Sequence, residues 1–340
     1  MHDFKMSSPT LIPSPVCFID GLARTGKRIL CQLFPALDNM EHPHFFYLLE
    51  QILAMMEHNR ISNDAARSLL TLQLNEFFCD YILSRNANFR PNELTSVFNA
   101  RHPQKFFENL SKEDHPNNMR EFSEGNTKYY SFQTHNLLTQ FKTFKKLELP
   151  YKVISIFRDP IDTVWSWYER GWGTRFDSDS RAFTTLIQTN SNTKLPWWCL
   201  SIDDLYSESS PMDRCILMHN ILLRRAIESA KNLNWNKGVL ILKFEDLCQD
   251  PDIALRKISQ FLGLSIGLNY SICFEKANIP RLLATQDKSH KLTKIQLNST
   301  PQIFQHLVKL HNDYNTSFFG ITDTRIKNLA QDNSESNNCR

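Results

Sequence analysis

Residues 16–37 read VCFIDGLARTGKRILCQLFPAL, and this stretch decides the fold class. Its first five residues, Val16–Asp20, form a short apolar run between Pro15 and Gly21, which is typical of a buried strand. Apolar residues then recur at helical spacing over residues 29–37. The sequence therefore predicts a strand, a glycine-containing loop and a helix in direct succession.

The loop of residues 21–28, GLARTGKR, matches the pattern G-x-x-x-x-G-K of phosphate-binding loops. Backbone N–H groups at the start of the following helix can converge on an anion. In an NTPase the residue after the lysine is Ser or Thr, and its hydroxyl holds Mg²⁺, but here that residue is Arg28. The loop thus offers cations to a phosphate-like group without an obvious metal ligand. A plain turn with solvated basic residues is the alternative, and the strand–loop–helix context argues against it.

Strands and helices alternate along the rest of the chain. Apolar runs predict three further strands, at 129–133, 151–157 and 238–244. Helical patterns occupy 45–84 (two helices), 137–146, 161–170, 211–233 and 252–262, the last closed by Gly263. Two insertions, 85–127 with a short helix near 103–110 and 171–210, are expected to be irregular. This alternation predicts an α/β fold of the P-loop NTPase type, a mostly parallel sheet flanked by helices on both faces, with helical and loop insertions.

The 340 residues are expected to form one α/β domain over residues 16–322. An N-terminal extension, 1–15, precedes it, and a polar tail, 323–340, is expected to be disordered. The extension lacks the apolar core of a signal peptide, and no apolar run approaches the ~20 residues that span a bilayer. We therefore expect no membrane partner.

Composition narrows the function classes. The formal net charge of +3 is too small to favour nucleic acid as a partner. The 8 cysteines include no C-x-x-C pair, so the sequence predicts neither a zinc site nor a disulfide framework. A reducing compartment fits best, and we expect a cytoplasmic location.

Two later segments carry polar residues at the ends of predicted strands. Residues 158–166, RDPIDTVWS, begin where the strand at 151–157 should end, and ligands of parallel sheets collect at such carboxyl ends. Arg158 can contact a phosphate bidentately, and Ser166 can hydrogen-bond the same group. Residues 240–251, LILKFEDLCQDP, run from an apolar strand into an acidic turn and are followed by ISQFLGL at 258–264.

In order and spacing, the segments 23–28, 158–166 and 240–251 resemble the sulfotransferase family, over roughly residues 16–264. The resemblance implies transfer of a sulfuryl group from 3′-phosphoadenosine 5′-phosphosulfate to a hydroxyl or amine of a small-molecule or glycan acceptor, with no metal. By position, the 5′-phosphosulfate would be held by Arg24, Thr25, Gly26, Lys27 and Arg28. Arg158 and Ser166 would hold the 3′-phosphate.

The loop departs from the family at Lys27 and Arg28, where two hydroxyl residues are usual. Here a hydroxyl contact to the donor is exchanged for positive charge, which makes Lys27 a candidate catalytic cation. A late basic motif that clamps the donor in many members has one candidate, Arg281, after Ile279 and Pro280.

Sulfuryl transfer needs a base for the acceptor proton and cations that offset charge on the donor. His135 follows the predicted strand at 129–133 and matches the T-H segment that provides the base in cytosolic members, although Gln133 replaces the usual lysine. Glu41, in MEHPHFF, resembles a segment where other members place a catalytic glutamate. Each has an alternative, since His135 can cap the next helix and Glu41 can pair with a cation. His42 and His44 lack the i, i+4 spacing of a helical metal site.

Two other functions stay open. A P-loop kinase using ATP and Mg²⁺ is suggested by the loop and by Glu245 and Asp246, but Arg28 argues against it. A non-catalytic sulfonucleotide-binding homologue would explain the altered loop. For the acceptor, three tryptophans in predicted loops, Trp172, Trp197 and Trp198, are candidates for stacking on a ring.

Overall fold

The computed structural model describes residues 4–12, 15–125, 128–189, 192–232, 238–268, 270–283 and 285–318. The predicted disordered tail, 323–340, lies outside these residues. Internal contacts divide the chain into two compact units. The sheet unit comprises Met1–Gly21, Gly26–Phe157 and Trp235–Leu282, and the helical unit comprises Leu22–Thr25, Arg158–Asn234 and Leu283–Arg340. The single domain over 16–322 stays a prediction.

The sheet unit is built on a five-stranded parallel sheet. Its strands, in spatial order, are β2 (His44–Phe45), β3 (Tyr130–Gln133), β1 (Val16–Asp20), β4 (Lys152–Phe157) and β7 (Val239–Lys243). The central strand β1 is buried at every residue and aligns Phe18 with Phe132 on one side and Val153 on the other. The four predicted strands and the parallel sheet are confirmed. β2 was not predicted because two residues give no alternation to detect.

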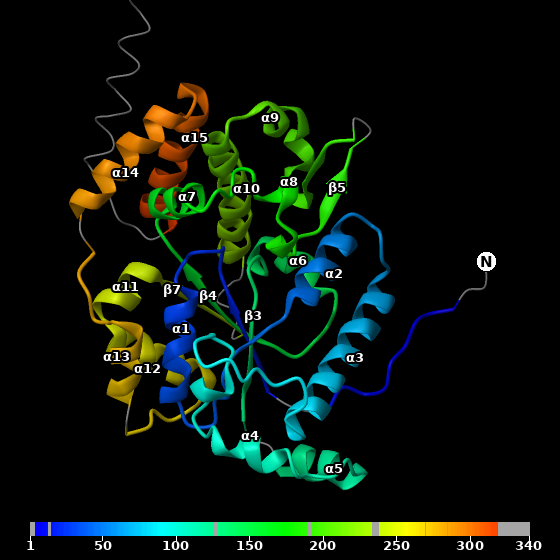
Figure 1. The fold of residues 1–340 in the computed structure, drawn as a ribbon. Helices are drawn as coiled ribbons and strands as arrows, with labels where there is room; N and C mark the ends of the chain where they lie inside the picture. The colour runs from blue at the N-terminus through cyan, green and yellow to red at the C-terminus, as the bar shows by residue number, and fades with distance from the viewer. Residues whose placement is uncertain are drawn as a thin grey trace, which may run out of the picture. The chain divides into compact units, whose positions relative to one another are not determined.

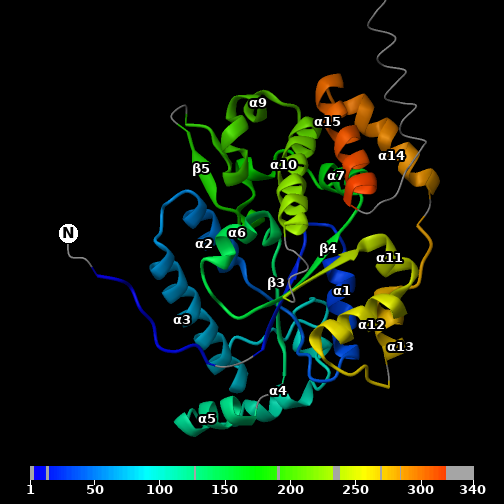
Figure 2. The ribbon, with the colours of Figure 1, turned by 180° about the vertical axis from the view of Figure 1, so that it is seen from behind.

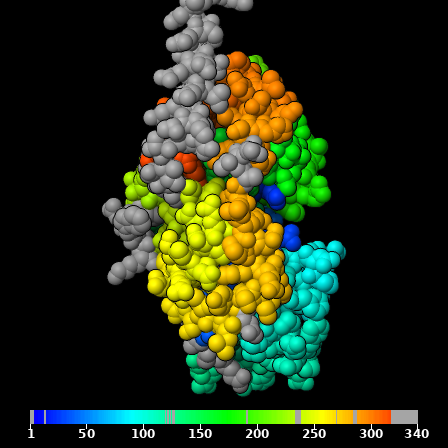
Figure 3. Space-filling model, turned by 90° about the vertical axis from the view of Figure 1, so that its left-hand side faces the viewer, coloured from blue at the N-terminus to red at the C-terminus, as the bar shows by residue number. Residues whose placement is uncertain are grey.

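Helices cover both faces of this sheet, as predicted. Figure 1 shows one group on one side of the strands and a second group on the other, and Figure 2 shows the same division from behind. The first group is α1 (Lys27–Leu33), α11 (Phe244–Gln249), α12 (Pro251–Leu262) and α13 (Tyr270–Ala277), and the second is α2 (Tyr47–Glu57), α3 (Asn63–Ile82) and α6 (Phe141–Lys145). In Figure 3 the yellow and amber surface belongs to α11–α13. α12 ends at Gly263 with φ 70°, which confirms the predicted helix end.

The insertion at 85–127 is more helical than predicted. It contains the expected short helix, α4 (Gln104–Asn109), and a second helix, α5 (Pro116–Gly125). α5 carries few apolar residues, but their helical spacing places them on one face, a signal that the expectation of an irregular insertion missed. Phe122 packs its ring 5.8 Å from that of Phe78 and 5.6 Å from that of Tyr130. These ring contacts hold α5 against α3 and β3.

The helical unit centres on α10 (Pro211–Lys231), which packs against α7 (Pro160–Tyr168) and α15 (Pro301–Asn312), while α14 (Thr285–Asn298) packs against α7. The insertion at 171–210 holds short elements only, α8 (Arg175–Ser178), α9 (Asp203–Glu208) and an antiparallel pair, β5 (Leu186–Gln188) and β6 (Lys194–Pro196). The described residues also contain short helical segments. These are 3-10 segments at Phe34–Ala36, Val97–Asn99, Leu138–Gln140, Ser180–Ala182 and Trp197–Ile202, and a π segment at Asp313–Phe318.

The tryptophans of this insertion do not form the open platform that the sequence suggested. Trp197 and Trp198 are buried, and their rings pack edge to face at 5.4 Å. Trp172 is half-buried, with its ring 5.6 Å from that of Trp167. The stacking hypothesis is therefore wrong for Trp197 and Trp198, because both belong to the core of the helical unit.

Candidate functional site

The loop after β1 contains three residues with positive φ: Gly21 (136°), Arg24 (71°) and Gly26 (105°). At Gly26 the need for glycine is also steric, because an added Cβ would overlap the Phe244 ring and lie 2.8 Å from its Cε2. Phe244 belongs to the FED segment that follows β7. The positive φ at Gly21 and Gly26 explains the glycines at these positions, because glycine adopts this backbone conformation without steric cost.

In the helical unit, residues 22–25 of the loop contact Arg158, just before α7, and the last turn of that helix. Arg158 donates from Nη1 to the Arg24 carbonyl oxygen at 3.0 Å, and Arg24 donates from Nε to Ser166 Oγ at 3.3 Å. Trp167 adds a hydrogen bond from Nε1 to the Ala23 carbonyl oxygen at 2.9 Å. The structure therefore brings together three of the residues that were predicted to hold the sulfuryl donor, Arg24, Arg158 and Ser166. Thr25 is buried, and its hydroxyl donates to the Leu22 carbonyl oxygen at 2.7 Å.

A third guanidinium, on Arg170, joins this cluster and was missed at the sequence level. Arg170 donates from Nη1 to Ser166 Oγ at 2.9 Å and to the Ser166 carbonyl oxygen at 3.0 Å. The spacing of Arg170 from Ser166 could have indicated this contact, because residues four apart on a helix are neighbours on its surface. Ser166 thus accepts hydrogen bonds from two arginines, which concentrates positive charge at this serine.

Asp159 fixes the helix that follows Arg158. Its carboxylate caps α7 by accepting from the Ile161 backbone N–H at 2.9 Å, and it also contacts Lys288 at 2.8 Å and His311 at 3.2 Å. Burial raises the pKa of Asp159, but hydrogen bonds and charge from His311 and Lys288 outweigh it and hold the pKa below its usual range. The buried carboxylate stays ionised and anchors the turn that carries Arg158.

In the sheet unit, the loop continues into α1 with Lys27 and Arg28. Lys27 is buried, and its ammonium donates to the Gly21 carbonyl oxygen of the same loop. Arg28 is exposed, and its guanidinium makes no hydrogen bond or ion pair with any residue that the structure describes. Arg281 holds its guanidinium 5.9 Å from the centre of the Phe244 ring, and its backbone N–H donates to the Cys248 carbonyl oxygen at 2.8 Å. Arg281 and Gly26 therefore share one neighbour, Phe244.

Asp20, the last residue of β1, was not predicted as a functional residue. Its buried carboxylate accepts from the backbone N–H groups of Leu137 and Leu138, at 2.9 and 3.0 Å, and from Thr134 Oγ1 at 3.0 Å. These contacts tie the turn after β3 to the end of β1. His135 lies within that turn, so Asp20 fixes its backbone.

His135 is held by Glu50 of α2. Glu50 Oε1 accepts from the His135 backbone N–H at 2.7 Å and lies 3.1 Å from His135 Nδ1. The imidazole also stacks on Tyr47, with centroids 5.9 Å apart and planes within 6°. Nε2 makes no hydrogen bond within the described part of the chain, and a quarter of the side chain is exposed. The His135 ring therefore contacts Glu50 and Tyr47, and it does not cap the next helix as the alternative proposed.

Glu41 lies in a different setting. Its carboxylate pairs with the ammonium of Lys128, and only 12% of the side chain is exposed. Burial raises the pKa of the neighbouring Tyr81 hydroxyl well above its usual value, and the charge on Glu41 adds to that effect. The ion pair that was the alternative for Glu41 is therefore present.

His42 and His44 pack their rings 4.6 Å apart. Burial lowers the pKa of His42 to about 4, so this imidazole is neutral at pH 7. Within the described residues, no group of three or more His, Cys, Asp or Glu side chains is arranged to hold a metal ion. Nor does any described helix have the length and apolar character needed to cross a bilayer.

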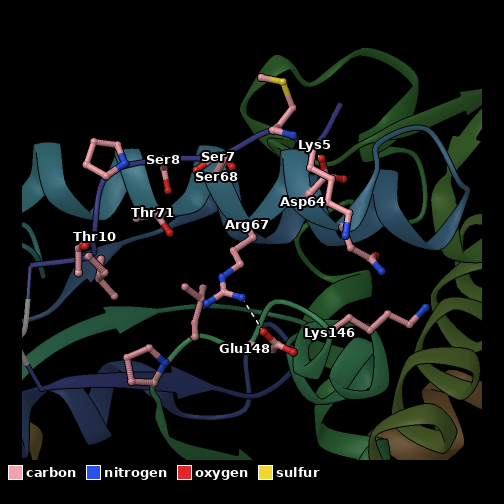
Figure 4. Close-up of a pocket in the computed structure, with 16 residues that line it drawn as sticks. Lys5, Ser7, Ser8, Thr10, Asp64, Arg67, Ser68, Thr71, Lys146 and Glu148 are labelled. Carbon is pink, nitrogen blue, oxygen red and sulfur yellow. Dashed lines mark hydrogen bonds and ion pairs between the residues drawn. The ribbon is translucent and has the colours of Figure 1, made fainter. Parts of the chain in front are cut away.

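A pocket of about 710 Å³ lies elsewhere in the sheet unit, under the N-terminal segment (Figure 4). It is lined by residues 5–11, by α3 and by residues 146–150, and Arg67 pairs with Glu148 across it at 2.5 Å. None of the predicted site residues lines it, so the pocket is separate from the residues described above.

Comparison with known proteins identifies the family. A family model described as "sulfotransferase domain" matches residues 17–276, well over half of the chain. The chain belongs to the sulfotransferase family. The resemblance predicted over residues 16–264 is confirmed and extends to 276. In this sulfotransferase, Arg281 and the helices α14 and α15 lie beyond the matched residues.

The chain resembles solved structures only at low sequence identity and low TM-score. A sulfotransferase from Alicyclobacillus acidocaldarius is 13% identical, with 93% of this chain and 100% of that chain covered and a TM-score of 0.41. A sulfotransferase domain from the curacin biosynthetic pathway is 12% identical (88% and 98% covered, TM-score 0.41), and a mouse sulfotransferase complexed with PAP is 13% identical (94% and 89% covered, TM-score 0.37). At these TM-scores, family membership rests on the domain match. No curated protein sequence matches the chain.

Proposed function

We propose that this sulfotransferase moves a sulfuryl group from 3′-phosphoadenosine 5′-phosphosulfate to a hydroxyl or amine of a small-molecule or glycan acceptor. The observation that carries the proposal is the pair of hydrogen bonds that joins Arg158 to the Arg24 carbonyl and the Arg24 guanidinium to Ser166, on a chain with a sulfotransferase domain. Two guanidinium groups and a hydroxyl gathered in this way can serve as a cradle for a phosphate.

The 3′-phosphate of the donor is assigned to Arg158 and Ser166 in the helical unit. Each charged hydrogen bond to the phosphate contributes about 1.5–3 kcal/mol. In the sheet unit, Gly26, Lys27 and Arg28 are assigned to the 5′-phosphosulfate. Arg24 and Thr25 directly precede them in the chain. The Lys27 ammonium has three N–H donors, so it can contact the sulfuryl group while one of them donates to the Gly21 carbonyl. Arg281, which lies on Phe244, stays a candidate donor contact.

His135 is the proposed base, and Glu41 is the alternative. His135 Nε2 has no hydrogen-bond partner among the described residues, whereas the Glu41 carboxylate is already engaged by Lys128. In the reaction the acceptor O–H proton passes to Nε2 while the acceptor oxygen bonds to sulfur. The bond between sulfur and the donor's phosphate oxygen breaks, and its electron pair leaves with adenosine 3′,5′-bisphosphate. Lys27 and Arg28 would offset the charge on that leaving group.

The cellular location is proposed to be the cytoplasm. All seven described cysteines are free, and six of them are buried. Free cysteines are usual in a reducing compartment, which supports this proposal.

Binding and transfer measurements test the proposal and its rivals. We expect calorimetry to show adenosine 3′,5′-bisphosphate binding without Mg²⁺. Radiolabelled donor would then be offered to 2-naphthol, an aliphatic alcohol, an aryl amine and desulfated heparin, and transfer to at least one is expected. Mg²⁺-dependent ATP binding without bisphosphate binding would establish the kinase instead. Bisphosphate binding with no transfer to any acceptor of the panel would favour the non-catalytic homologue.

A further inference from the structure

Glu50 engages His135 at two points with a single oxygen atom. Oε1 accepts from the backbone N–H at 2.7 Å and lies 3.1 Å from Nδ1, although 85 positions separate the two residues. We propose that Glu50 is a positioning residue that fixes the tautomer and the orientation of the His135 imidazole. The inference rests on the proposed role of His135 as the base.

The tautomer follows from hydrogen-bond chemistry. An ionised carboxylate only accepts hydrogen bonds, so Nδ1 must be the donor to Glu50. A neutral imidazole has one N–H, and a proton on Nδ1 leaves the lone pair on Nε2. Nε2 is the nitrogen without a partner in the described residues, on a ring that is a quarter exposed. Glu50 therefore leaves the basic lone pair on Nε2, the ring nitrogen that it does not contact.

The same carboxylate serves the next step. When Nε2 takes the acceptor proton, the ring becomes an imidazolium that carries a full positive charge. Glu50, hydrogen-bonded at Nδ1, then becomes its counter-ion, as the carboxylate does in a Ser-His-Asp triad. Glu50 touches neither donor nor acceptor, so it acts only through His135.

The orientation has two further supports within the sheet unit. Asp20 holds the turn by the N–H groups of Leu137 and Leu138. Tyr47 stacks on one face of the His135 ring. Tyr47 and Glu50 lie three residues apart in the first turn of α2, so one face of the helix presents both to His135. That first turn is also where a helix dipole favours negative charge.

Nitrogen-15 NMR of histidine-labelled protein tests the tautomer without any acceptor. The His135 signal is assigned by its loss in His135→Gln. Wild type should carry the ring proton on Nδ1, and Glu50→Gln should keep it there, because the amide oxygen still accepts. Glu50→Ala should shift the proton wholly or partly to Nε2. A wild-type proton on Nε2, or an unchanged tautomer in Glu50→Ala, overturns the proposal.

Glu57→Gln is the matched control. Glu57 lies on the same helix and accepts from Gln140 Nε2 at 3.2 Å, close to the same turn. This variant should leave the His135 tautomer and the turnover at the wild-type level. A tautomer change in Glu57→Gln would mean that the turn responds to any loss of charge on α2, which would overturn the specific role of Glu50.

Turnover separates positioning from a structural role. With 2-naphthol as acceptor, Glu50→Ala should lower kcat at least about 100-fold and Glu50→Gln about 10-fold, within the range of general-base catalysis. KM for 2-naphthol and bisphosphate affinity should stay within about threefold. Wild-type kcat in Glu50→Ala, with His135→Gln inactive, would overturn the role of Glu50. Full activity in His135→Gln would instead contradict the proposed base, while the NMR result still decides the tautomer.

Discussion

The ring of Phe244 fills the space that a side chain on Gly26 would need. An added Cβ would lie 2.8 Å from Cε2 of that ring, and Gly26 has a φ of 105°. Two motif segments far apart in the sequence, the loop after β1 and the start of α11, therefore require each other in the sheet unit.

Gly26→Ala should be strongly destabilising, because it combines overlap with Phe244 and a left-handed backbone. We expect a loss of about 2–4 kcal/mol in the free energy of unfolding, measured with urea. Gly263→Ala is the control, since Gly263 also has positive φ (70°) but nothing within 4 Å of an added Cβ. It should lose only about 1–2 kcal/mol. Equal losses in the two variants would mean that Phe244 yields to the added methyl group.

Arg158→Ala should weaken binding of adenosine 3′,5′-bisphosphate by about 1.5–3 kcal/mol, the contribution of a charged hydrogen bond. Adenosine 5′-monophosphate lacks the 3′-phosphate, so its affinity, also measured by calorimetry, should change little. Arg67→Ala removes an arginine that pairs with Glu148 at the separate pocket and serves as the control. An equal loss for both nucleotides, or none, would contradict the assignment of Arg158 to the 3′-phosphate.

His135→Gln should lower kcat by about 10²–10⁴-fold, the contribution of a general base, with bisphosphate binding retained. Glu41→Gln should act mainly on stability, because it removes the negative charge of the ion pair with the Lys128 ammonium. Steady-state kinetics with 2-naphthol and thermal unfolding of both variants compare the two residues. If Glu41→Gln stays folded, binds the bisphosphate and loses more turnover than His135→Gln, Glu41 is the base.

Acid should destabilise the helical unit through His219 of α10. Burial lowers the pKa of this fully buried imidazole to about 3, whereas the unfolded value is about 6.5. The unfolded chain therefore binds a proton below pH 6.5 that the folded chain does not. The stabilising contribution is complete above pH 6.5 and is lost progressively as the pH falls toward 3.

Between pH 7.5 and pH 5.0 this linkage amounts to about 2 kcal/mol. His219→Leu cannot take up the proton, so its free energy of unfolding should fall about 2 kcal/mol less over that interval than the wild-type value. Urea unfolding at the two pH values measures the difference. His306→Leu, at an exposed position of α15, should behave as wild type. A wild-type pH response in His219→Leu would show that His219 does not stay neutral when buried.

Local patterns sufficed for the strands and for most helices. Val16–Asp20 is apolar throughout and is punctuated by Pro15 and Gly21, so its burial as a strand follows from its own residues. Arg24, Arg158 and Ser166 were singled out because each follows a predicted strand and matches a family segment, and their roles stay predictions. The stacking prediction for Trp197 and Trp198 was wrong because the position of a residue in a loop segment does not indicate whether its side chain is buried.

The sequence by itself determined the parallel α/β framework, the loop and the family, since hydrophobic periodicity and motif spacing are properties of short segments. Only the tertiary structure decided what each polar side chain contacts: Glu50 with His135, Lys128 with Glu41, Asp20 with the turn at Leu137, and Arg170 with Ser166. Most of these pairs lie far apart along the chain. A hydrogen bond forms only within about 3 Å, and chain folding, not local composition, sets that distance.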